Sequence, residues 1–152
     1  MRDILIKSLA IMLPASILII GCTGGRPENL GVMDGRLAPC PPSPNCVSSQ
    51  STDNEHAVEP LHYSTSTPEA MAGLRKIILQ MKRTKIVTET NNYLHAEFAS
   101  ALWHFVDDVE FSFDDHAKLI QLRSASRQGY SDFGVNRKRV ETIRAAWQES
   151  GK

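Results

Sequence analysis

The sequence of 152 residues lacks the motifs that mark most enzyme families. It holds no G-x-S-x-G nucleophile motif and no H-E-x-x-H zinc motif, and its five histidines show no paired ligand spacing. Net positive charge is also missing, because 17 basic residues balance 17 acidic ones. We therefore predict no catalytic residues, no metal site, no cofactor and no binding to nucleic acid.

Long apolar runs are equally scarce, with one exception near the N-terminus. The run Ser8–Ile20 follows Arg2 and Lys7, and it is too short for a comfortable membrane span. It ends at the tetrapeptide IIGC, residues 19–22. A basic start and a short apolar stretch that ends in small residues are typical of a signal peptide, which we place at residues 1–21.

The tetrapeptide resembles the lipobox of bacterial lipoproteins. This resemblance implies that Cys22 is lipidated, with a diacylglyceryl group and an N-acyl chain such as palmitate, and that it anchors the protein to a membrane of the cell envelope. Thr23 follows the cysteine, where retention in the inner membrane commonly depends on Asp. The outer membrane, facing the periplasm, is therefore favoured in a cell that has one. The alternatives are an ordinary signal peptide and an uncleaved anchor.

Two cysteines remain after Cys22, and they lie at the start of the expected domain. Residues 22–39 contain glycines and prolines with few large apolar side chains, which predicts a lipidated N-terminus followed by a flexible tether. The next segment is a C-x5-C with three prolines, and exported proteins keep their disulfides. A disulfide between Cys40 and Cys46 is favoured over two free thiols. We expect one folded domain over residues 40–149.

Periodicity predicts the first helix and the strands around it. Thr67 is the expected N-cap and Pro68 suits the first turn, before apolar residues at helical spacing up to Met81. A strand is expected within residues 56–63, and two more follow the helix at about Lys85–Thr90 and Tyr93–Ala101.

A hairpin follows, with a first strand of period two. Its predicted core face carries Phe105, Asp107, Val109, Phe111 and Phe113. After a loop at residues 114–117 the returning strand places Ile120 opposite Phe111 and Leu122 opposite Val109. On the outer face this register pairs Asp108 with Arg123, where we expect a weak, solvent-screened ion pair.

The last helix is predicted to begin after Asn136 as its N-cap and to bury Val140, Ile143 and Trp147. The order is then β-α-β-β-β-β-α. Each helix has one apolar stripe, so an α+β fold is expected, with an antiparallel sheet of four to five strands and both helices packed on one face. This order resembles the TATA-binding-protein-like and helix-grip folds, in which the space between sheet and last helix sometimes holds a hydrophobic ligand.

Charged residues around the hairpin form the candidate polar site. Asp107 falls on the core face, where an unpaired carboxylate is costly, and we expect Arg127 to turn beneath the last helix towards it. Three cations lie in the first turn of that helix, where the positive end of the helix dipole disfavours them. We therefore expect an internal carboxylate or an external anion close to them. The cluster comprises Asp107, Asp108, Arg123, Ser124, Ser126, Arg127, Tyr130, Asp132, Asn136, Arg137 and Arg139.

Several stretches resemble a known bacterial and plastid family. They are the C-x5-C segment continuing to Gln50, then FVDDVEF at 105–111, RSASR at 123–127, GYSD at 129–132 and GVNRKRVE at 134–141. Together they look like the family of domain of unknown function 1499, over about Leu37 to Trp147. That family has no established activity, so the resemblance implies a fold and an envelope location but no catalytic residues.

Three functional hypotheses remain open. The first is a non-catalytic envelope lipoprotein that binds an envelope protein or an amphipathic or anionic ligand. The second is a purely structural envelope protein. The third is an unrecognised enzyme that would use Asp107 with Arg127 and Arg137. A cavity between the sheet and the last helix would favour ligand binding, and a filled core would favour the structural role.

Overall fold

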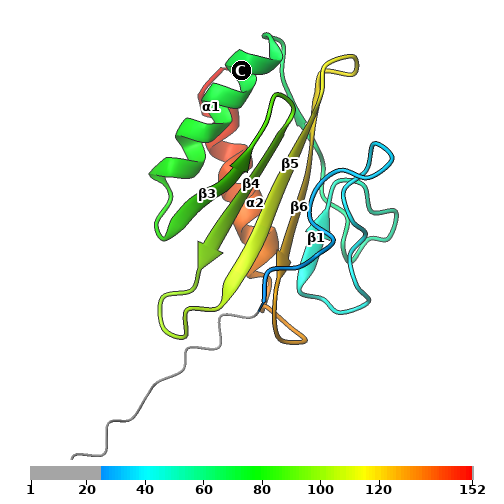
Figure 1. The fold of residues 1–152 in the computed structure, drawn as a ribbon, viewed down its shortest axis with the longest axis vertical. Helices are drawn as coiled ribbons and strands as arrows, with labels where there is room; N and C mark the ends of the chain where they lie inside the picture. Colours follow the sequence, from blue (N-terminus) through cyan, green and yellow to red (C-terminus); the bar gives the residue numbers. More distant parts are fainter. Residues whose placement is uncertain (1–24, 152) are drawn as a thin grey trace, which may run out of the picture.

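The computed structural model describes residues 25–151, and within them the chain forms one antiparallel sheet and two helices (Figure 1). The predicted α+β class and order of elements are confirmed. The signal peptide, Cys22 and Thr23 lie outside the described residues. The elements are β1 Cys46–Ser48, β2 Leu61–His62, α1 Thr67–Gln80, β3 Thr84–Glu89, β4 Tyr93–Ala99, β5 Val106–Asp114, β6 Leu119–Ser126 and α2 Val135–Glu149.

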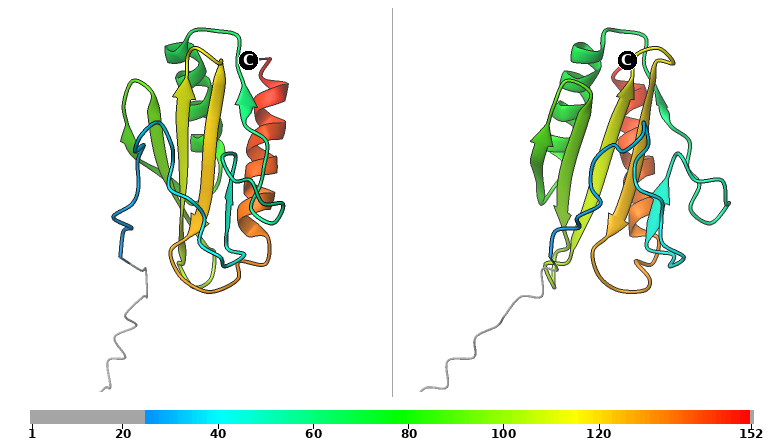
Figure 2. Two further views of the ribbon diagram at one scale, coloured as in Figure 1. Left: turned by 90° about the vertical axis from the view of Figure 1, so that its right-hand side faces the viewer. Right: turned by 45° about the vertical axis from the view of Figure 1, so that its right-hand side comes forward.

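Five of the six strands lie in the order β1-β6-β5-β4-β3. The sixth, β2, also pairs with β6, at Leu119 and Ile120, whereas β1 pairs with residues 123–125 of that strand. Both helices cover one face of this sheet, as predicted, and the N-terminal segment crosses the other face (Figure 2). We call these the helix face and the outer face. The sheet is therefore covered on both sides, although its sequence pattern indicates only one apolar face.

Strand β1 is an addition to the predicted set. Its residues follow the disulfide loop, and Val47 pairs with Ser124 on β6. The stretch from Val47 to Asn54 is polar and resembles a turn in the sequence, but the main chain of β6 supplies hydrogen-bond partners that local composition cannot indicate. Strand β2 is shorter than the expected strand within residues 56–63.

The hairpin of β5 and β6 has the predicted faces but a shifted register. Phe111 lies opposite Leu122 rather than Ile120, and Phe113 lies opposite Ile120. The shift arises because β5 continues to Asp114, whose carboxylate accepts hydrogen bonds from the amides of His116 and Ala117 and so closes the turn later. A shift by an even number of residues keeps every side chain on its face.

Both helices begin one or two residues before their predicted starts. Ser66, not Thr67, is the N-cap of α1, and its backbone amide donates to the carboxylate of Glu69. Helix α2 follows Gly134, which adopts the left-handed conformation with φ 77°. Asn136 is therefore not a cap but a buried member of the first turn.

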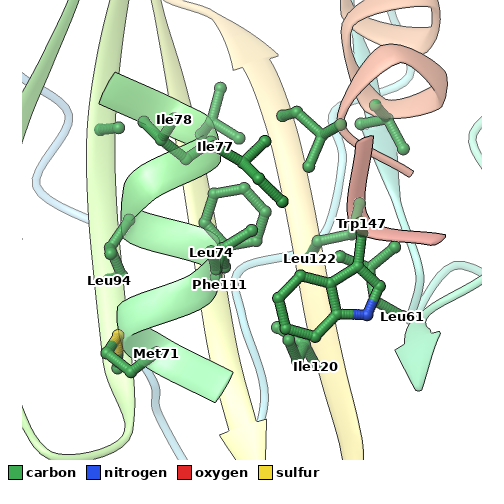
Figure 3. Close-up of a cluster of buried hydrophobic side chains, with 14 of the residues drawn as sticks. Leu61, Met71, Leu74, Ile77, Ile78, Leu94, Phe111, Ile120, Leu122 and Trp147 are labelled. Carbon is green, nitrogen blue, oxygen red and sulfur yellow. The ribbon is translucent and has the colours of Figure 1, made fainter. Parts of the chain in front are cut away.

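The core lies between the helix face and the two helices (Figure 3). Trp147 of α2 packs beside Leu61 and Leu122, while α1 contributes Leu74 and Ile78 over β4 and β5. These side chains fill the space between the sheet and α2. No helix within residues 25–151 is long and apolar enough to cross a membrane.

Candidate functional site

Asp107 is the centre of a polar cluster on the helix face. One carboxylate oxygen of Asp107 accepts a hydrogen bond of 2.5 Å from Arg139, which projects from the first turns of α2. The guanidinium of Arg139 also donates to Ser124 and to the Asn136 side chain, and it stacks over the Phe98 ring, 4.8 Å from the centroid. The carboxylate at the edge of the apolar core is thus paired internally.

Asn136 connects this cluster to β6 and to the residue that precedes β1. Its side-chain oxygen accepts a hydrogen bond from Ser124, and its amide nitrogen donates to the Asn45 carbonyl and to Ser126, each at 3.0 Å. The side chain is fully buried, so both of its polar atoms need partners, and both have them. Asn136 holds the start of α2 against β6 and the end of the disulfide loop.

The other charged residues at the start of α2 serve as structural links. The carboxylate of Asp132 accepts hydrogen bonds from the amides of Gly134 and Asn136 and so caps the helix. Arg137 donates to the main-chain carbonyls of Glu55 and Ala57. Two of the three cations that the sequence places against the helix dipole are therefore compensated within the fold, Arg139 by Asp107 and Arg137 by carbonyl groups, whereas Lys138 is exposed.

A second polar cluster lies on the outer face, around Asp108. Arg127 binds this carboxylate through Nε and Nη2, both at 2.8 Å, and Nη2 also donates to Glu97. His95 Nε2 lies 2.7 Å from Oδ1 of the same carboxylate, the oxygen that also accepts from Arg127 Nη2. Arg26 approaches His95 Nδ1 at 3.3 Å and can only donate, so Nδ1 accepts and the ring proton on Nε2 points at Asp108.

Glu110 belongs to the same outer-face cluster and lies two residues after Asp108 on β5. One oxygen accepts hydrogen bonds from the Tyr93 hydroxyl at 2.8 Å and the Gly31 amide at 2.7 Å, and the other accepts from Arg123 at 3.2 Å. Glu110 is 0% exposed. The Nε of Arg123 is buried and has no hydrogen-bond partner among the described residues.

The pKa values of this cluster follow from its contacts. Burial alone would raise the pKa of Asp108, but the hydrogen bonds from Arg127 and His95 outweigh it and lower the pKa. The pKa of Arg127 is raised, chiefly by the bond to Asp108. Burial, together with the negative charge of Glu110, raises the pKa of the Tyr93 hydroxyl. Asp108 and Arg127 are therefore held in their ionised forms, and the Tyr93 hydroxyl keeps its proton.

The N-terminal segment covers the outer-face cluster. The expected flexible tether includes residues 25–39, and the structure places these residues along the sheet, with Arg26 on His95 and Thr88 and Gly31 on Glu110. Leu37 is buried, and its amide donates to the side chain of Gln50. These contacts exclude water from carboxylates that would otherwise face solvent.

Several predicted pairings are wrong. Arg127 binds Asp108 on the outer face and not Asp107, because β6 keeps its alternation to Ser126 and the side chains at 123 and 127 stay on the same face. Arg123 lies opposite Glu110 and is buried, whereas we expected an exposed pair with Asp108. The set of Asp107, Arg127 and Arg137 proposed for an enzyme is therefore not assembled.

Tyr130 and Phe105 also lie outside the clusters. Tyr130 is exposed in the loop between β6 and α2. Phe105 precedes β5 and is half exposed, so it does not belong to the predicted core face.

Sequence reasoning missed His95, Glu97, Glu110, Tyr93 and Arg26 as members of the outer-face cluster. The alternation of Tyr93, His95 and Glu97 with apolar residues along β4 carries the signal, since it places all three on one face. Within residues 25–151 no three His, Cys, Asp or Glu side chains are grouped so as to hold a metal ion. The carboxylates of Asp107, Asp108 and Glu110 instead bind arginines, and these pairs link neighbouring strands and α2.

The predicted disulfide is present and borders a surface depression. Cys40 and Cys46 are bonded, with their Cα atoms 5.6 Å apart. The depression beside them has a volume of about 640 Å³ and is lined by residues 29–40 and by the turn at 48–53. Met33 gives it apolar surface, Arg36, whose guanidinium donates to the Gln50 carbonyl, gives it a cation, and Asp34 and Asp53 give it two carboxylates.

The sheet, its two helices and the two paired clusters define an α+β domain whose conspicuous polar residues stabilise the fold. The family model described as "Protein of unknown function (DUF1499)" matches residues 36–147, and the chain belongs to this family. The resemblance seen in the sequence is thereby confirmed. No curated protein matches the sequence.

Proposed function

We propose that this protein is a non-catalytic cell-envelope lipoprotein whose domain binds an amphipathic ligand. The space between the sheet and α2 is filled, which favours the structural alternative at that place, so the depression between residues 29–40 and the turn at 48–53 carries this proposal. It combines the exposed apolar side chain of Met33 with the Arg36 guanidinium and the carboxylates of Asp34 and Asp53, a combination suited to a ligand with an apolar part and a polar, charged part. Its volume of about 640 Å³ is in the range of small-molecule sites.

The state of the charged clusters supports binding over catalysis. Asp107, Asp108 and Glu110 each accept hydrogen bonds from an arginine. A general acid or base must exchange a proton near neutral pH and reach a substrate, and these paired, buried groups are poorly placed for either.

The envelope location rests on the sequence. The lipobox-like residues 19–22 support lipidation at Cys22, and Thr23 favours transfer to an outer membrane where the cell has one. The test is the variant Cys22→Ala in the natural host with radiolabelled palmitate. The wild type should incorporate label and the variant should not, and equal labelling of both would refute the lipid anchor.

Ligand binding is tested by native mass spectrometry of the protein extracted from its own envelope. A retained mass is expected on the wild type and should be lost in Met33→Ser, which removes an exposed apolar side chain from the depression. Leu79→Ser is the matched control, because Leu79 is also exposed but lies on α1. Retention of the same mass by all three proteins would place the ligand elsewhere, and no mass on any of them would favour a structural role.

A further inference from the structure

Exposed apolar side chains are concentrated at one end of the domain. Nine large hydrophobic residues are exposed among residues 25–151, and six of them lie on or beside two loops, at residues 100–105 and 127–134. The six are Leu102, Trp103, Phe105, Tyr130, Phe133 and Val135. Scattered single exposures are ordinary, but a group of this kind marks an interaction surface.

The two loops lie side by side at the end of the sheet opposite the C-terminus (Figures 1 and 2). One joins β4 to β5 and the other joins β6 to α2, and the ends of these strands are neighbours in the sheet, where Asp107 pairs with Ser126. The backbone amide of Arg127 donates to the Val106 carbonyl, which links the bases of the loops. We call this surface the aromatic end.

Two non-glycine residues of these loops adopt the left-handed backbone conformation. Phe133 has φ 54° and His104, next to Trp103, has φ 52°, a region that non-glycine residues rarely adopt. Phe133 is 96% exposed and Trp103 72% exposed, so neither side chain compensates for the strain by packing on the domain. Strained residues of this kind cluster at binding sites.

The described chain also begins at the aromatic end, and this identifies the occupant. The first described residues lie at the same end of the sheet as the two loops (Figure 1), and Arg26 donates to Thr88 on β3 and approaches His95 on β4. Three peptide units separate Cys22 from Gly25, so they span at most about 10 Å. An acyl group on Cys22 would therefore hold the aromatic end at the bilayer rather than let the domain stand away from it.

The composition of the aromatic end agrees with a bilayer surface. Trp and Tyr favour the headgroup region of membranes, and Leu and Phe favour the acyl boundary below it. Exposed cations flank the two loops: Arg83 donates to the Ala99 carbonyl beside the first, and Lys138 follows the second in the first turn of α2. Cations at this position would contact anionic headgroups.

We propose that the aromatic end is a lipid-binding surface that inserts Leu102, Trp103 and Phe133 into the interface of the membrane that carries the protein. This proposal rests on the lipid anchor proposed above. The anchor supplies attachment, and the aromatic end sets the orientation of the domain, with the opposite end of the sheet directed away from the membrane.

The test uses the full lipidated protein in vesicles of phosphatidylethanolamine and phosphatidylglycerol with brominated acyl chains, which quench tryptophan on contact. The chain has two tryptophans, and Trp147 is buried in the core near the C-terminus, so it serves as an internal reference. We expect the bromolipid to reduce the wild-type emission by roughly half, because one of the two indoles lies at the lipid interface. Trp103→Phe, a change at an exposed side chain, should abolish the quenching.

Vesicle flotation separates this proposal from the anchor. Protein that floats with the vesicles without quenching at Trp103 would overturn the aromatic end as a lipid surface and leave the anchor standing. Protein that fails to float would refute the anchor. Equal quenching of wild type and Trp103→Phe would also overturn the proposal, as would photo-crosslinking of positions 103 and 133 to a protein rather than to lipid in the envelope.

Discussion

Arg127 donates a hydrogen bond of 2.8 Å to each carboxylate oxygen of Asp108 on the outer face of the sheet, from two different nitrogens of its guanidinium. The Asp108 side chain is 1% exposed and that of Arg127 7% exposed, so removal of either partner would leave the other buried. A charge stranded in this way costs far more than a surface pair contributes.

Arg127→Ala should therefore lower the free energy of unfolding by about 3–5 kcal/mol, since Asp108 and Glu97 would lose their shared cation. Urea denaturation at neutral pH measures this loss. Arg75→Ala is the matched control, because Arg75 binds Glu89 at 3.2 Å with both side chains largely exposed. That variant should change stability by about 0–1 kcal/mol, and equal losses would contradict a buried pair.

Asp107 should couple to Arg139 and not to Arg127. A double-mutant cycle with Asp107→Ala and Arg139→Ala should give a coupling of about 0.5–3 kcal/mol, because the two side chains are directly hydrogen-bonded. The cycle with Arg127→Ala should be additive within about 0.5 kcal/mol, because Asp107 and Arg127 face opposite sides of the sheet and share no partner. A larger coupling in the second cycle would show that we have placed Arg127 on the wrong face.

The turn before β2 should give a stability maximum at mildly acidic pH. Hydrogen bonds from Ser51 and then His56 lower the pKa of Asp53 from 3.8 to about 2, so its contribution is present above pH 3.8 and is lost as pH falls. Burial alone would lower the pKa of His56, but its bonds to Asp53 and to the Ser43 carbonyl raise it above 6.5. The contribution of His56 is therefore present below pH 6.5 and lost as pH rises through the folded value.

The stability difference between wild type and Asp53→Asn should accordingly be largest between about pH 4 and 6.5, and smaller both at pH 2 and at pH 9. Urea denaturation across this range measures it. Glu149→Gln, an exposed acid at the end of α2, should show no such maximum. A difference that stays constant with pH would mean that the two side chains do not interact in solution.

Loss of the disulfide should have a local, moderate effect. The bond joins Cys40 to Cys46 across a sequence separation of 6, so the chain entropy it removes from the unfolded state is small. The double variant Cys40→Ser/Cys46→Ser should lose about 2 kcal/mol in urea denaturation. A reductant should produce the same loss in the wild type and none in the variant, and an effect on both would indicate some other target of the reductant.

Alternation predicted the helix face of the hairpin because its apolar residues occur at every second position. Val109, Phe111 and Phe113 are all buried there. The same alternation suggested that Asp108 and Glu110 face water, since charged side chains usually do. They are buried because a distant segment, residues 26–37, covers them, and neither the glycines nor the prolines of that segment indicate this in the sequence.

The pairing of charges was harder to predict than their presence. The sequence indicated that a cation must lie near Asp107, and Arg139 supplies it. The choice between Arg127 and Arg139 depended on where β6 ends and on where α2 begins, and both boundaries lie near glycines whose conformation tertiary contacts decide. The His95 contact with Asp108 depends on the register between β4 and β5. The loop that joins these strands is not a tight turn of a recognisable type, so the sequence does not indicate that register.

The position of the N-terminal segment bears on how this chain can be shortened. A chain starting at residue 36, where the family match begins, would retain every helix and strand but would lack Arg26 and Gly31. Glu110 would then lose one of its three donors and His95 its contact with Arg26. The folding unit therefore extends ahead of the segment shared with the family. A shortened protein needs to begin before Arg26 to keep the buried charged side chains of β4 and β5 covered.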